Sequence, residues 1–276
     1  MKYFLTLFAL LLLCGCTKTV SKSDFPLYYS IVLNTDEYSS ITNAPTICIY
    51  INGNPVDIFV DENSIAIPIN EFLRPGTNEL RITDLAKRSW DLAVEEADQK
   101  TKSATTLLET NFDAPEKGFA VSLNLTNVTW SLPLFDSVIP ENLSTNSVLE
   151  FLNHVYSKLP IKDEKDESSV VNLLQNDGWA IWQTRAYGVK AEVLADEQVD
   201  AKESLESVES VTESPTSDTI KIIRGPNAIM VYCGVASPQK IYLMAYLARL
   251  QMKDGSKNLS PDLMLYRKNG GWAIWK

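Results

Sequence analysis

The chain has 276 residues, of which 45% are hydrophobic, and its formal net charge is −10. This length predicts two domains, because a domain usually spans about 100–200 residues. The acidic balance argues against nucleic acid as a partner and against electrostatic adhesion to anionic lipid, since both need clustered Lys and Arg.

The first 15 residues have the pattern of an export signal. Met1-Lys2 carries a positive charge, and residues 3–13 form an apolar run that only Thr6 interrupts. The run is about half of the roughly 20 residues that a transmembrane helix needs, so it predicts a signal peptide and not a membrane span. The alternatives are an ordinary secretory signal with incidental cysteines, or a buried N-terminal helix.

A lipidation motif closes this segment. Leu13-Cys14-Gly15-Cys16 resembles the lipobox of bacterial lipoproteins, in which a Leu and two small residues precede an obligatory Cys. The resemblance implies cleavage before Cys16 and attachment of acyl chains such as palmitate to that residue. Several chains, at about 0.8 kcal/mol per buried methylene, make such an anchor stable. Residues 16–25 then form a lipidated tether, and Thr17 in place of Asp implies the periplasmic side of the outer membrane in preference to the inner membrane.

Residues 26–135 have the pattern of an antiparallel β-sandwich domain. Strands are expected at 27–33, 46–51, 56–60 and 64–69, and at 88–95, 104–112 and 118–126. Another strand follows the Pro-Gly turn at 75–76 and ends at residue 82. Asn52-Gly53 lies between two β-branched runs and predicts a type I′ hairpin, because that turn needs positive φ at both central residues. Residues 64–69 alternate with a period of two, and Pro68 places their strand at a sheet edge.

One stretch of this domain also carries a family pattern. The Asn52-Gly53 hairpin, a short connection and Pro75-Gly76-Thr77-Asn78 resemble the jelly-roll modules attached to many glycoside hydrolases. The resemblance implies a β-sandwich fold, and it supports sugar binding less strongly than it supports the fold.

Residues 141–276 predict an α+β domain. Apolar residues recur at helical spacing from Val148 to Leu159, between a cap at Thr145-Asn146-Ser147 and Pro160, and a second helix is expected at 168–175. Strands expected at 220–223, 228–235, 240–251, 259–267 and 272–275 would form an antiparallel meander. The order of helices and strands, with the closing residues 263–276, resembles the nuclear-transport-factor-2-like superfamily, which implies a cone-shaped α+β fold.

Residues 191–219 interrupt that pattern. They contain nine acidic residues, a single Lys and no aromatic residue. Because such a segment buries too little apolar surface to offset its ordering entropy, we expect a flexible acidic insertion, with a helix as the alternative.

The sequence carries no recognisable catalytic, cofactor or metal motif. His154 is the single histidine, and no cluster of Cys, Asp and Glu around it forms a recognisable metal motif. A phosphate loop, a nucleophile elbow and a calcium loop are all missing. We therefore expect a non-enzymatic protein without a cofactor. An enzyme would require a polar cavity in the α+β domain.

Tryptophan supplies the candidate binding residues. The pentapeptide Gly-Trp-Ala-Ile-Trp occurs twice, ending at Trp182 and at Trp275. On a strand Trp272 and Trp275 face opposite sides, so one belongs to the core, while the other either packs or forms an exposed anchor. Trp90 and Trp130 are candidate platforms for stacking on a glycan.

Two cysteines remain after processing. Cys48 and Cys233 both lie in apolar, strand-like runs. They are expected either as buried free thiols or as a disulfide, which an oxidising periplasm would permit.

Two functional hypotheses follow. In the first, a membrane-anchored lipoprotein docks an envelope protein through the acidic insertion and the exposed member of the Trp272/Trp275 pair. In the second, the sandwich holds a glycan or peptidoglycan on Trp90 or Trp130. A flat apolar patch of several hundred Å² on the surface would favour the first, and an open groove lined by Trp would favour the second.

Overall fold

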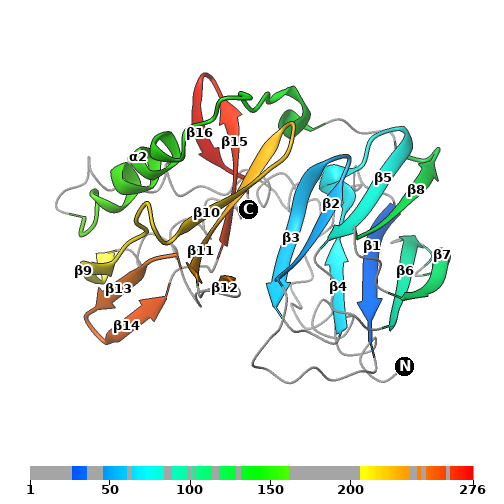
Figure 1. Cartoon of the computed structure of the whole chain (residues 1–276), viewed down its shortest axis with the longest axis horizontal. Coiled ribbons are helices and arrows are strands. Elements are labelled where there is room, and N and C mark those ends of the chain that lie inside the picture. The colour runs from blue at the N-terminus through cyan, green and yellow to red at the C-terminus, as the bar shows by residue number, and fades with distance from the viewer. Residues whose placement is uncertain are drawn as a thin grey trace.

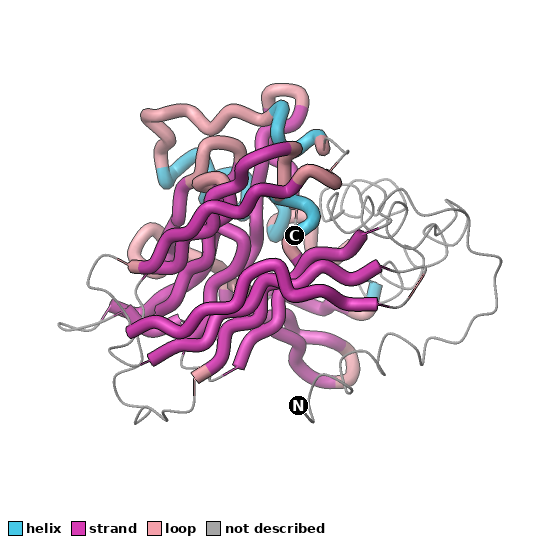
Figure 2. The backbone as a smooth tube through the Cα atoms, turned by 90° about the vertical axis from the view of Figure 1, so that its right-hand side faces the viewer, coloured by secondary structure: helices cyan, strands magenta, loops and turns pink. Residues whose placement is uncertain are grey.

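The computed structural model of the chain describes residues 27–35, 46–60, 64–83, 89–98, 101, 103–113, 118–128, 132–161, 206–236, 241–243, 247–258 and 262–275. Strands make up most of this backbone (Figure 2), and each strand pairing in it is antiparallel. The expected class, mainly β with an α+β part, is confirmed.

Eight strands form the expected β-sandwich. They are β1 (Leu27–Asn34), β2 (Thr46–Ile51), β3 (Asn54–Val60), β4 (Ser64–Pro68), β5 (Gly76–Thr83), β6 (Ser89–Asp98), β7 (Ser103–Asp113) and β8 (Phe119–Leu125). One sheet has the order β4-β1-β6-β7 and the other β3-β2-β5-β8. Alternate residues of both sheets, such as Ile31 and Ile49, point into a common core. Strand β4 lies at a sheet edge, as Pro68 predicted.

The Asn-Gly hairpin between β2 and β3 is confirmed, since Asn52 and Gly53 have φ of 53° and 77°. Asn78 is fully buried behind this turn. Its Oδ1 accepts hydrogen bonds from Asn52 Nδ2 (2.8 Å) and from the Arg74 backbone N–H (2.8 Å), and its Nδ2 donates to the carbonyls of Arg74 and Gly76. The Asn of the Pro-Gly motif therefore fixes the turn before β5 against the hairpin.

The second part of the chain adds two further sheets. Its strands are β9 (Val208–Glu213), β10 (Ile220–Arg224), β11 (Ala228–Ala236), β12 (Ile241–Leu243), β13 (Arg249–Met252), β14 (Gly255–Asn258), β15 (Asp262–Lys268) and β16 (Gly271–Ile274). One sheet has the order β10-β11-β15-β16, with β12 paired to β11, and a smaller sheet has the order β14-β13-β9.

The expected single strand at 240–251 is wrong. Strand β12 pairs with β11, whereas β13 pairs with β14 and β9 in the smaller sheet. A continuous apolar run gives no indication of where the chain passes from one sheet to another, because both strands need apolar side chains. The simple meander is therefore divided between two sheets.

The expectation of a flexible acidic insertion is wrong for its C-terminal end. Residues 208–213 form β9, and Val208 and Val211 pack with Leu250 and Met252. These two valines provide the apolar face of a strand, which the average composition of the segment concealed. Residues 191–205 lie outside the described residues.

Helix α2 (Thr145–Tyr156) forms where the apolar spacing predicted a helix. Its cap is Ser144, one residue before the expected cap, and the Ser144 hydroxyl accepts from the Asn146 backbone N–H at 3.2 Å. The face that carries Val148, Leu152 and Val155 is buried. The second helix expected at 168–175 lies outside the described residues. In the part of the chain that the structure describes, no helix is long and apolar enough to cross a membrane.

The sheet β10-β11-β15-β16 lies between the sandwich and α2 (Figure 1). On β11, Met230 belongs to the same apolar core as the sandwich strands. Its neighbours Ile229 and Val231 belong to a second core, which α2 covers. The two halves of the sequence are therefore packed against each other through a shared core.

A buried polar junction holds these halves together. The Asn54 carboxamide donates to Asn227 Oδ1 (3.1 Å) and accepts from the Asn227 backbone N–H (2.9 Å). Asn227 Nδ2 donates to the carbonyls of Phe135 and Ser137, and Arg74 Nη2 donates to Asn227 Oδ1 (2.8 Å). Both Asn side chains are buried, and every polar atom on them has a partner.

The described residues also include two short 3-10 helices. They are η2 (Asn70–Phe72) and η3 (Pro133–Asp136). From η2, Glu71 Oε2 accepts a hydrogen bond from Trp275 Nε1 at 2.8 Å. This hydrogen bond joins the C-terminal end of the described chain to the sandwich.

Candidate functional site

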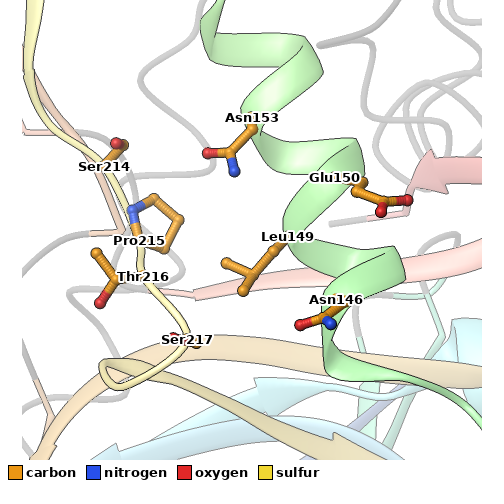
Figure 3. Close-up of a pocket in the computed structure, with 8 residues that line it drawn as sticks. All are labelled: Asn146, Leu149, Glu150, Asn153, Ser214, Pro215, Thr216 and Ser217. Atoms are coloured by element: carbon orange, nitrogen blue, oxygen red, sulfur yellow. The ribbon is translucent and has the colours of Figure 1, made fainter.

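An open cleft lies between the outer side of α2 and the segment that joins β9 to β10 (Figure 3). Its volume is about 540 Å³, within the range of roughly 300–1,000 Å³ that ligand sites occupy. The lining residues come in two groups of four, one from each wall. They are Asn146, Leu149, Glu150 and Asn153 from the helix, and Ser214, Pro215, Thr216 and Ser217 from the connecting segment.

The helix wall follows from the amphipathic pattern of α2. Asn146, Glu150 and Asn153 recur at intervals of four and three residues, so they share one exposed face of the helix, beside the buried apolar face. All three are exposed, whereas Leu149 is 8% exposed and lies at the base of the wall. Figure 3 shows Asn153 and Leu149 directed toward the opposite wall, and Glu150 directed away from it.

The opposite wall is fixed by a hydrogen-bonded turn. The Thr216 backbone N–H donates to Thr219 Oγ1 (2.9 Å), and the Thr216 carbonyl accepts from the backbone N–H of Ile220 (2.9 Å). Pro215 is buried and restricts the backbone at the centre of the wall. The wall is therefore held in place by the start of β10.

Several lining side chains have unused hydrogen-bonding capacity. Within the described residues, no hydrogen bond or ion pair is formed by the side chains of Asn146, Glu150, Asn153 or Ser214. A carboxamide offers donors and acceptors, a hydroxyl offers both, and a carboxylate accepts. Together the eight residues provide two carboxamides, three hydroxyls, one carboxylate and two apolar side chains. Such a lining can bind a polar chain through hydrogen bonds.

The Trp pair at the end of the chain faces opposite sides, as the period of two predicted. Trp275 and Ala273 pack in the core shared with the sandwich, while Trp272 and Ile274 pack in the core under α2. Trp275 is fully buried. Trp272 is half-buried, and the Arg267 guanidinium lies 4.9 Å from the centre of its ring. Neither ring lines the cleft.

The glycan platforms expected on the sandwich have different outcomes. Trp90 is fully buried between the two sheets, so its ring faces are not accessible for stacking on a sugar. The prediction of Trp90 as a platform is therefore wrong, because strand periodicity cannot tell which face of a sheet is covered. Trp130 lies outside the described residues.

The other chemistry-bearing residues lie apart from the cleft. Cys48 and Cys233 are both buried and are not joined in a disulfide, and burial raises the pKa of the Cys233 thiol, which keeps it protonated. His154 is exposed on the last turn of α2. Within the described residues, no three His, Cys, Asp or Glu side chains are placed to hold a metal ion. Cys16 lies outside the described residues.

The cleft was not foreseen from the sequence. The spacing of Asn146, Glu150 and Asn153 was visible in the helix pattern, but any solvent-facing side of a helix has polar residues at that spacing. The opposite wall is about 60 residues further along the chain, within the segment expected to be flexible. This wall follows β9, which pairs with β13, and only the folded chain places it opposite the helix.

Comparisons with known proteins give a weak likeness. No protein-family model matches the chain, and no curated protein matches it. A solved structure to which it is similar is a cystatin-like protein from Ruminococcus gnavus ATCC 29149, with 12% sequence identity and a TM-score of 0.14. The match covers 72% of this chain and 57% of that chain. A TM-score this low carries no argument about fold or function.

Proposed function

We propose that this chain is a lipid-anchored lipoprotein of the bacterial cell envelope, and that it docks a protein partner without catalysing a reaction. The lipobox ending at Cys16 supports the anchor. The observation that carries the docking role is the cleft between α2 and residues 214–217, because its lining offers unengaged carboxamides and a hydroxyl to a polar chain. Acyl chains hold the protein at the membrane, and the folded body presents the cleft.

The tether limits where the partner lies. Residues 16–25 span at most about 35 Å when fully extended, at 3.3–3.6 Å per residue. The folded body therefore stays close to the membrane that holds its lipid, on the periplasmic side of the outer membrane in our proposal. A partner must come within that distance, as a component of the envelope does.

Glycan or peptidoglycan binding is the second candidate. Carboxamide and hydroxyl groups also bind sugars, so the polar lining of the cleft fits this role as well. The burial of Trp90 counts against the sandwich as the place where a sugar stacks. The two candidates differ in what remains bound to the protein after purification.

Mass spectrometry of the membrane fraction tests the anchor. In the wild type we expect the N-terminal peptide to begin at an acylated Cys16. Cys16→Ser should release the protein from the membrane, while Cys14→Ser, a matched change in the segment that is removed, should leave acylation intact. An unmodified Cys16 in a soluble wild-type protein would show that the anchor is wrong.

Chemical crosslinking in intact cells, followed by purification of the acylated protein, tests the docking role. We expect a specific envelope protein that is captured with the wild type and lost from the membrane fraction with Cys16→Ser. Retention of muropeptides, with no protein captured, would replace docking by glycan binding.

A further inference from the structure

We infer that the cleft between α2 and residues 214–217 receives an extended segment of the partner protein, and that this segment carries a Lys or Arg side chain. The inference rests on the proposed docking function and names the site and the chemistry of its ligand. It is drawn from the spacing of the carboxamides, from the charge of Glu150, which we call the rim of the cleft, and from Leu149 and Pro215. These two buried apolar residues are called the floor of the cleft.

The two carboxamides match the repeat of an extended chain. Asn146 and Asn153 are seven residues apart, nearly two full turns, so they lie on one side of α2 at an axial separation of about 10.5 Å. Three residues of an extended chain span about 10 Å. A carboxamide has the same donor and acceptor as a peptide group, and the two Asn side chains can each bond to one peptide unit of the same segment.

The charge of the cleft selects a basic segment. Glu150 is placed between the two Asn positions on the helix and has no ion-pair partner within the described residues. Asp218, which follows the last lining residue, is also exposed. The eight lining residues include no Lys, Arg or His, and the whole chain has a net charge of −10. A Lys or Arg that crosses the rim is therefore attracted, and an acidic segment is repelled.

The floor favours a peptide over a glycan. Leu149 and Pro215 give it two apolar surfaces, which suit an apolar side chain of an extended segment whose alternate side chains point inward. Sugar rings usually stack on aromatic side chains, and the eight lining residues include none. The combination of backbone-matching amides, an apolar floor and an acidic rim fits a polypeptide.

Site-specific photo-crosslinking in living cells tests this inference. The crosslinking residue p-benzoylphenylalanine is placed in the acylated full-length protein, either at Ser217 in the cleft or at Ser122, an exposed position on β8. Mass spectrometry then maps the partner peptide attached at each position. We expect a segment that contains Lys or Arg, attached from Ser217.

Three variants of the protein that carries the crosslinking residue at position 217 test which side chains of the cleft bind the partner. Asn153→Ala should reduce the crosslink yield by about fivefold, as expected for loss of a hydrogen bond to a peptide group. Glu150→Lys should abolish the crosslink, since it places a positive charge where the basic side chain arrives. Asn124→Ala removes an exposed carboxamide on β8, which lies on the opposite side of the molecule from α2 (Figure 1), and should leave the yield unchanged.

The outcomes separate this inference from the function it rests on. If a partner is captured from Ser122 but not from Ser217, or if the Ser217 crosslink ignores Asn153→Ala and Glu150→Lys, the cleft is not the docking site although docking stands. A partner segment without Lys or Arg overturns the charge assignment. If neither position captures a protein, docking itself fails, and muropeptides attached at Ser217 would assign the cleft to a glycan.

Discussion

Two regions of this molecule use the same side chain in opposite ways. At the junction between the sandwich and the second part of the chain, the carboxamides of Asn54 and Asn227 are buried and fully hydrogen-bonded. In the cleft, those of Asn146 and Asn153 are exposed and make no hydrogen bond within the described residues. The junction uses its carboxamides to hold the fold, and the cleft leaves its own for a ligand. Substitutions can measure that difference.

The largest effect is expected for Asn227→Ala. The change leaves the carbonyls of Phe135 and Ser137 without their donor and deprives Asn54 of its partner side chain. Because a buried polar group without a partner costs about 1–3 kcal/mol, we expect the free energy of unfolding to fall by about 3 kcal/mol. Urea denaturation measures the change. A loss below about 1 kcal/mol would mean that water replaces the side chain and that the junction is not a structural device.

Gly225→Ala tests how tightly the junction is packed. A Cβ atom at Gly225 would lie 2.7 Å from Asn54 Cα and 2.8 Å from Pro55 Cδ. Both contacts are with rigid parts of β3, so the backbone must shift, and such overpacking typically costs about 1–3 kcal/mol. We expect a loss of about 2 kcal/mol in the same denaturation experiment. Gly271→Ala is the control for the loss of a glycine, since its φ lies outside the left-handed region and a Cβ there would meet only Lys268 O, at an ordinary distance of 3.8 Å.

Trp275→Phe tests the second fastening of the junction. Phenylalanine keeps an aromatic ring beside Tyr266 but removes the hydrogen bond from Nε1 to Glu71 and leaves part of the site empty. We expect a loss of about 1.5 kcal/mol, from one hydrogen bond to a carboxylate and a small cavity. Trp272→Phe is the matched change in the same pentapeptide. It should cost less, because Trp272 is half-buried and its Nε1 has no hydrogen-bond partner in the described part of the chain.

The contrast between these two regions also explains which features could be predicted from the sequence. Local features were predicted correctly: Asn52-Gly53 specified its hairpin, and the apolar spacing from Val148 onward specified α2. The opposite faces of Trp272 and Trp275 followed from the strand period, but which of them is buried depends on the sheet that covers each face.

Long-range features could not be predicted for a physical reason. Asn54 and Asn227 are 173 residues apart, and an isolated Asn after a Gly or before a strand has the chemistry of an ordinary turn residue. The walls of the cleft are likewise distant in sequence, and β9 was concealed by the acidic composition around Val208 and Val211. In each case the role of a residue depends on an element that is distant in sequence and becomes its neighbour only through tertiary packing.

The smallest effect on stability is expected for Asn153→Ala, and it sharpens the comparison most. Asn153 is exposed and its side chain makes no hydrogen bond within the described residues, so its removal leaves no orphaned partner. Alanine also has the higher helix propensity, by a few tenths of a kcal/mol, which offsets any small loss. The free energy of unfolding should therefore stay within about 0.5 kcal/mol of the wild type. A loss near that of Asn227→Ala would assign Asn153 to the fold, and a weaker Ser217 crosslink with Asn153→Ala could then be attributed to unfolding instead of to a lost ligand contact. An unchanged stability combined with a weaker crosslink would leave the ligand contact as the physical cause.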